Sequence, residues 1–152
     1  MKRIVTYGVG SILNTWDAAL TLERWHEVIR TIQDLATQET RLGIPVLYGI
    51  DAVHGHNYLK EATLFPHQLA LAATWNPDLV REAAHVTATE TRATGVPWNF
   101  APVLDVGRQP LWSRFFETFG EDPYLVARMG VAAVEGMQGD DLARRQTGWR
   151  RR

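Results

Sequence analysis

The sequence contains no cysteine and no long apolar run, and these two absences exclude several kinds of site. Without cysteine among its 152 residues, neither a disulfide nor a thiolate metal site can form. No apolar stretch approaches the roughly 20 residues that span a bilayer. Thr6, Gly8 and Gly10 also interrupt the apolar run that a signal peptide needs. We therefore expect no membrane partner, and the sequence indicates no compartment.

Basic charge is scarce outside the last nine residues. Residues 144–152 hold five of the 16 basic residues and no acid. The other 143 residues carry 11 basic against 17 acidic groups, a net charge of −6. Because an acidic body repels phosphate backbones, we expect no nucleic-acid partner. The basic end is either a binding tail or a segment foreign to the domain.

The composition is otherwise that of one globular domain. Apolar residues make up 45% of the chain and charged residues 22%, and the length suits a single core. Six tryptophans are many for this length. Their flat rings either pack against sugar faces or lie buried in the core, and composition does not choose between the two.

Apolar segments alternate with amphipathic ones three times along the chain. We predict strands over 4–13, 44–51 and 96–105, and helices over 22–40, 76–95 and 122–139. The helical segments repeat apolar residues every three or four positions, and two of them open with Asn or Asp followed by proline. Three β-then-α units predict an α/β fold with a parallel sheet. Either a doubly wound sheet or part of a (β/α)8 barrel fits, since a whole barrel needs about 250 residues.

Polar residues follow the second and third predicted strands in two long loops, 52–75 and 106–121. Loops of two to six residues are usual there, and functional groups gather at this edge of a parallel sheet. Asp51 ends the second strand, where its carboxylate would be partly buried and could accept hydrogen bonds from sugar hydroxyls. The alternative is a structural cap on the following loop.

Arg114 offers a fixed fork of donors that can hold a carboxylate or sugar oxygens. Its alternative role is a structural ion pair with one of three nearby acids, Glu117, Glu121 or Asp122. The two roles can coexist, since a paired arginine often serves as a positioned donor.

The five histidines give little support for a metal-binding site. His54 and His56 form an H-x-H pair, which some barrel hydrolases use for metal binding. The flanking glycine predicts instead that both lie in a loop, so we expect no metal. We expect His67 to pack within that loop and His26 and His85 to lie on helix surfaces. Glycine-rich nucleotide motifs and the G-x-S-x-G elbow are absent, so we expect no cofactor.

Four long motifs resemble the N-terminal domain of family 3 glycoside hydrolases, in the family's order. They are RLGIPVLYGIDAVHGHN (41–57), ATLFPHQLALAATWNPDLV (62–80), ATETRATGVPWNFAPVLDV (88–106) and RQPLWSRFFETFGEDP (108–123). The resemblance implies a partial (β/α)8 barrel of about three β/α units over residues 1–141. Residues 142–152 are an Arg-rich tail outside the pattern, such as a frameshift or premature stop would leave.

The resemblance also implies a function and two site residues. Family members are β-glucosidase-like enzymes that remove terminal glucosyl or xylosyl residues from β-linked oligosaccharides or glucosides, with retention. Asp51 and Arg114 match the family's residues for binding the terminal sugar. The family's nucleophile and acid/base would lie further along, so we expect no catalytic residue and no hydrolysis from this chain. The alternative is a non-catalytic sugar-binding or interaction module.

Two further expectations follow. The family's usual R-D-P-R-W-G-R is here RQPLWSR, with Gln109, Leu111 and Ser113 in the altered positions. The resemblance therefore does not fix the orientation of the Arg114 side chain.

Three β/α units cannot close a barrel, so unpaired sheet edges would favour self-association.

Overall fold

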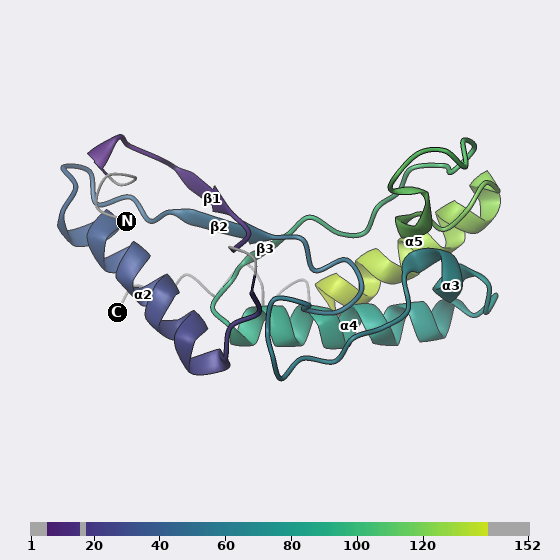
Figure 1. The fold of residues 1–152 in the computed structure, drawn as a ribbon, viewed down its shortest axis with the longest axis horizontal. Coiled ribbons are helices and arrows are strands. Elements are labelled where there is room, and N and C mark those ends of the chain that lie inside the picture. Colours follow the sequence, from purple (N-terminus) through teal and green to yellow (C-terminus); the bar gives the residue numbers. More distant parts are fainter. Residues whose placement is uncertain (1–5, 16–17, 140–152) are drawn as a thin grey trace.

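The computed structural model describes residues 6–15 and 18–139. Strands and helices alternate along the chain (Figure 1). In chain order they are β1 (Ser11–Leu13), α2 (Leu22–Gln38), β2 (Leu47–Ile50), α3 (Gln68–Ala72), α4 (Pro77–Ala93), β3 (Trp98–Asn99), the 3₁₀ turn η1 (Phe115–Glu117) and α5 (Pro123–Gln138). Over the described ranges, no helix is long and apolar enough to cross a membrane.

The three strands form a parallel sheet in the order β1-β2-β3, which confirms the predicted α/β alternation. Ser11 pairs with Leu47, and Gly49 pairs with Trp98. Because the strands are parallel and adjacent, their carboxyl ends meet at one edge of the sheet. The loops predicted to carry the site leave from that edge.

The second strand is shorter than predicted, because a helix side chain takes over its first ladder bonds. Instead of 44–51, strand β2 covers Leu47–Ile50. The amide of Gln33 donates to the Val46 carbonyl at 2.7 Å and accepts from the Val46 N–H at 3.0 Å. The side chain of α2 thus occupies the place of a neighbouring strand.

The first and third predicted strands are wrong over much of their length. Instead of 4–13, only Ser11–Leu13 is strand; Gly8 has φ of 71°, which breaks an extended backbone, and residues 1–5 lie outside the described part. Instead of 96–105, only Trp98–Asn99 is strand. Pro97 and Pro102 flank it, and proline has no N–H to donate to a ladder.

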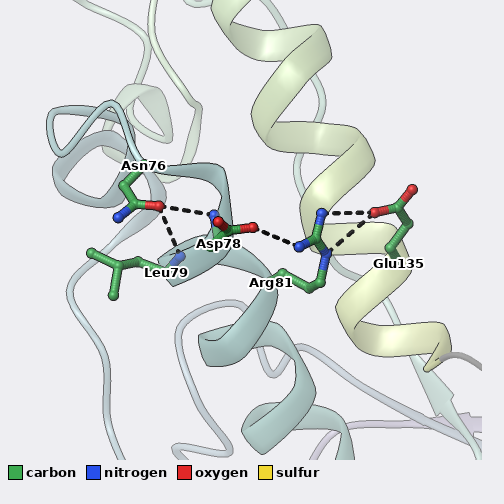
Figure 2. A network of polar contacts seen from close by, with 5 residues as sticks. All are labelled: Asn76, Asp78, Leu79, Arg81 and Glu135. Carbon is green, nitrogen blue, oxygen red and sulfur yellow. Dashed lines mark hydrogen bonds and ion pairs between the residues drawn. The ribbon is translucent and has the colours of Figure 1, made fainter.

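The helix starts predicted from the sequence are confirmed. Asn76 Oδ1 accepts from the N–H groups of Asp78 and Leu79 at 3.0 and 3.4 Å (Figure 2). Asp122 caps α5 in the same way, through Tyr124 N and Leu125 N. Capping residues satisfy amides that the first helical turn leaves unpaired, so these short signals act locally and are readable without the fold.

Apolar side chains gather in two cores. The first joins α2 to the sheet and to the loop after β2, and Trp25 lies fully buried in it. The second lies among α3, α4 and α5, around Phe119 and Met129. At its rim Arg81 of α4 binds Glu135 of α5 at 3.1 Å (Figure 2).

Helix α3 was not predicted. Its five residues lie inside the loop expected over 52–75, and Gln68 and Ala72 face the interior. A five-residue helix is too short to show a period of 3.6 residues in sequence. Gln68 Oε1 accepts from the Val103 N–H at 3.1 Å, and this bond ties the helix to the segment after β3.

Candidate functional site

Asp51 and Asn14 meet at the carboxyl edge of the sheet, one residue beyond β2 and β1. Asn14 Nδ2 donates to Asp51 Oδ2 at 2.8 Å, and the Asp51 N–H donates to Asn14 Oδ1 at 2.9 Å. The Tyr48 hydroxyl donates to the Asn14 carbonyl. Asn14 has φ of 54°, a left-handed conformation in which asparagine is enriched among non-glycine residues. The reciprocal pair holds the Asp51 carboxylate in one orientation.

A second asparagine secures the other side of β2. Asn99, at the end of β3, accepts from the Ala52 N–H at 2.9 Å and donates to the Ala52 carbonyl at 3.1 Å. The backbone around Asp51 is therefore bonded by side chains from both neighbouring strands. The Asp51 carboxylate itself accepts from Asn14 of the neighbouring strand.

Arg114 lies at the start of η1 and pairs with Glu117. Its Nε donates to Glu117 Oε2 at 2.7 Å, and its Nη2 lies 2.5 Å from the same oxygen. The pKa of Arg114 is raised, first by this hydrogen bond and the charge of Glu117, and further by the charges of Asp51 and Asp105. Asp51 and Arg114 are thus near enough for their charges to interact.

The partner of Arg114 is one of the three acids predicted. Asp122 is engaged as the cap of α5, whereas the side chain of Glu117 is only 16% exposed and carries the ion pair. The Arg114 side chain is 51% exposed. With Nε and Nη2 directed at Glu117, the rest of the guanidinium fork faces away from the pair, so the arginine is positioned and still accessible.

The histidines of the H-x-H pair turn to different surroundings. His56 is fully buried and its Nε2 lies 3.2 Å from Thr94 Oγ1. The Thr94 hydroxyl donates to Thr91 O at 2.7 Å, so it accepts from His56 Nε2–H. His54 contacts the Phe65 carbonyl through Nδ1 at 2.9 Å. The two rings therefore do not converge on a common ligand.

Burial lowers the pKa of His56 from 6.5 to about 4, and the charge of Glu90 opposes this shift. A neutral ring is consistent with its place against Trp25, 5.6 Å between ring centroids. Within residues 6–15 and 18–139, no group of three or more His, Cys, Asp or Glu side chains is arranged to hold a metal ion.

The other histidine predictions are confirmed. His67 packs within its loop, 4.0 Å from His54 between ring centroids. His26 and His85 are exposed on helices, and His26 Nε2 lies 2.7 Å from the Ala93 carbonyl.

The described tryptophans differ in burial. Trp25 is buried and its indole N–H donates to the Tyr58 carbonyl at 2.9 Å. Trp75 and Trp98 are 70% and 40% exposed. Trp16 and Trp149 lie outside the described residues.

Sequence reasoning missed both asparagines of the site. One signal was available for Asn14 alone: it directly follows the strand predicted over 4–13, and parallel strands bring such ends together. Asn99 falls inside the strand predicted over 96–105, so no such signal existed for it. The reciprocal bonds themselves join residues 37 and 47 positions apart, which no local pattern reveals.

The chain is similar to glycoside hydrolases over nearly its whole length. Residues 1–146 match the glycosyl hydrolase family 3 N terminal domain. A lysosomal beta glucosidase of Dictyostelium discoideum is 48% identical over 142 residues, covering 88% of this chain and 17% of that protein. A beta-xylosidase of Formosa agariphila is 42% identical over 118 residues, covering 74% of this chain and 16% of that protein.

The fold, too, is similar to that of a solved glycoside hydrolase. The structure of the exo-1,3/1,4-beta-glucanase from a Pseudoalteromonas species superposes with a TM-score of 0.82 and 37% identity, over 91% of this chain and 18% of the other. This chain thus belongs to the glycosyl hydrolase family 3 N-terminal domain family and spans about a sixth of the relatives' length.

Proposed function

We propose that this family 3 chain forms the part of a β-glucosidase-type site that binds outer hydroxyls of a terminal, non-reducing glucosyl or xylosyl residue. One observation carries the proposal: Asp51, held by Asn14 at the sheet edge, lies within charge range of a paired and accessible Arg114. A fixed carboxylate and a fixed guanidinium fork together supply acceptors and donors for neighbouring hydroxyls.

Asp51 accepts hydrogen bonds from the sugar through the oxygens that Asn14 leaves free. Arg114 donates from the side of the guanidinium that does not face Glu117. Because both groups are already oriented by protein partners, little side-chain entropy is lost when a sugar binds. Neither group is proposed as nucleophile or acid/base.

Hydrolysis belongs to a longer protein that contains this domain. A retaining mechanism needs two carboxyl groups about 5–5.5 Å apart across the glycosidic bond. We propose that both come from beyond this chain, and that the three β/α units here are part of a (β/α)8 barrel. The relatives' names support a β-linked glucoside or xyloside as substrate. The proposed mechanism uses two carboxyl groups and calls for no metal or other cofactor.

A binding measurement on the 152-residue chain tests the site. Methyl β-D-glucoside should shift backbone NMR signals near Asp51 and Arg114. Asp51→Asn should weaken binding about tenfold or more, because an amide replaces a charged acceptor. Asp34→Asn, the same exchange on the exposed face of α2, is the matched control and should bind like the wild type. Equal binding by both variants would refute the assignment of Asp51.

An activity measurement tests whether the catalytic carboxyl groups lie outside this chain. The 152-residue chain should release no product from an aryl β-glucoside above a blank preparation. In a longer protein that contains the chain, Asp51→Ala should lower kcat/KM by about 100-fold or more, because bonds to sugar hydroxyls strengthen in the transition state. The loss of stability should be far smaller, since only one bond to Asn14 is lost. Turnover by the short chain would show that it carries its own catalytic groups.

A further inference from the structure

Three aromatic rings form a stack that joins the loop after β2 to η1. The ring centroids of His54 and His67 lie 4.0 Å apart with planes tilted by 34°. Phe116 meets His67 edge-on, with 4.6 Å between ring centroids and 83° between the ring planes. His54 is held in turn, because its Nδ1 donates to the Phe65 carbonyl at 2.9 Å. The stack is therefore anchored at one end to the loop and at the other to η1.

His67 is suited to a neutral state in this stack. Its Nδ1 is buried and has no hydrogen-bond partner among the described residues. A neutral ring can place a lone pair there at modest cost, whereas protonation would add a charged N–H with no acceptor. Charged or titratable groups face His67 from two elements: His54 from the loop, and Glu117 from η1.

Burial and the neighbouring His54 lower the pKa of His67 below its ordinary value of 6.5, while the charge of Glu117 opposes the shift. The neutral ring therefore predominates at pH 7 and above. Glu117 is thus the carboxylate whose charge acts on His67. That same carboxylate holds Arg114 at 2.7 Å.

We propose that His67 is a positioning residue for Arg114. In its neutral form, stacked between His54 and Phe116, it holds η1 so that Glu117 pairs with Arg114. In its protonated form the ring would carry a charge in a buried contact with no acceptor at Nδ1, so the ring contacts loosen, η1 shifts and the guanidinium loses its position. The consequence for sugar binding rests on the proposed function, but the link between His67 and the Arg114–Glu117 pair does not.

The experiment follows the Arg114 Nε–Hε NMR signal of the 152-residue chain from pH 7.5 to pH 5, above the ordinary carboxyl pKa of about 4. At pH 7.5 we expect a shifted, slowly exchanging signal, identified by its absence in Arg114→Lys. On acidification it should move to the position of a free arginine, with the same midpoint as the His67 ring signals. His67→Phe keeps an aromatic ring but cannot titrate, so its Arg114 signal should stay unchanged to pH 5.

Different midpoints for His67 and Arg114, or an unchanged pH response in His67→Phe, would overturn the proposal. If His67→Phe does not fold, the midpoints in the wild-type chain decide alone. Affinity for methyl β-D-glucoside should fall at least fivefold between pH 7.5 and pH 5 in the wild type and stay level in His67→Phe. Matching midpoints without any sugar binding would contradict the proposed function and leave the positioning role intact.

Discussion

At the scale of single residues, the orientation of Asp51 depends on Asn14, whose backbone and side chain are both constrained. The residue adopts φ of 54° and makes two side-chain hydrogen bonds across to the neighbouring strand. A residue in this conformation stores about 1 kcal/mol or more of strain, which persists only where surrounding bonds offset it. The pair of bonds to Asp51 is that compensation.

Asn14→Gly tests this coupling. Glycine adopts the same φ without strain, so the variant relieves that strain but removes the side-chain bonds and leaves Asp51 without its partner. We expect the free energy of unfolding to fall by about 2 kcal/mol, measured by urea denaturation, and sugar affinity to fall with it. Trp75→Gly is the matched control: Trp75 also has positive φ, 53°, but is 70% exposed, so the change should be neutral or stabilising. Equal effects of the two changes would contradict this account.

His56 predicts a pH dependence of stability. Its folded pKa of about 4 lies below its ordinary value of 6.5, so the unfolded chain takes up a proton first as the pH falls. The contribution of the neutral His56 ring to the unfolding free energy is fully present above pH 6.5. Up to roughly 3 kcal/mol of this contribution is lost as the pH falls to about 4.

Replacement of the buried ring should remove this dependence. His56→Gln can still donate to Thr94 but does not titrate, so its unfolding free energy should vary less between pH 6.5 and pH 4. Urea denaturation at several pH values measures the slope. The same exchange at exposed His85 should leave the wild-type slope unchanged, and a slope that survives in His56→Gln would assign the effect to other groups.

At the scale of elements, α4 and α5 approach closely because Gly136 has no side chain. A Cβ at Gly136 would lie 2.2 Å from the Arg81 carbonyl oxygen and 2.9 Å from the Ala84 Cβ. Backbone atoms of a packed helix cannot yield to such a contact, so the helices would have to separate. By contrast, the Arg81–Glu135 ion pair at the rim is solvent-exposed, so water and salt screen it and it contributes little to stability.

Two glycine substitutions in α5 should therefore differ. Gly136→Ala should lower the unfolding free energy by about 1–3 kcal/mol, although alanine favours helix more than glycine. At Gly130 a Cβ would meet only the end of the Leu104 side chain, at 2.7 Å, and Leu104 is 51% exposed and free to move. Gly130→Ala should be neutral or stabilising. Thermal unfolding of both variants measures the difference. A reversed order would show that the helix contact is looser than described.

At the scale of the whole molecule, the described residues leave much apolar surface uncovered. In the sheet they form, β1 and β3 are edge strands, and such edges pair readily with other chains. Along α5 runs a groove of about 500 Å³, lined largely by apolar residues that include Leu104, Val126, Val131 and Val134. Parallel sheets are normally covered on both faces, so these surfaces favour association.

We expect the isolated 152-residue chain to form oligomers through these surfaces, while each copy keeps its fold. Sedimentation reports the mass, and near-ultraviolet circular dichroism reports fixed tryptophan packing. Val131→Lys, on a residue 57% exposed, should reduce association without disturbing the core. A clean monomer with a sharp, cooperative unfolding transition would show that three β/α units are self-sufficient, and would favour the sugar-binding module over the barrel part.

What the sequence by itself determined is the order of elements, the helix starts and the neighbourhood of the site. Caps such as Asn76 and Asp122 and the spacing of apolar residues act within one or two turns, so their physics is local. The two long loops at the strand ends also followed from the pattern, as did Asp51 and Arg114 as candidates. The family resemblance, now confirmed by the match over residues 1–146, rests on the same four motifs.

Only the tertiary structure decided where strands end and how the site residues are held. Gln33 replaces a strand neighbour beside Val46, 13 positions away, and Asn14 reaches Asp51 across 37. The choice of Glu117 as the partner of Arg114 depends on how η1 turns, and the neutral state of His56 depends on burial by α2 and α4. These bonds join segments that fold together only when the core forms, so no local pattern of residues encodes them.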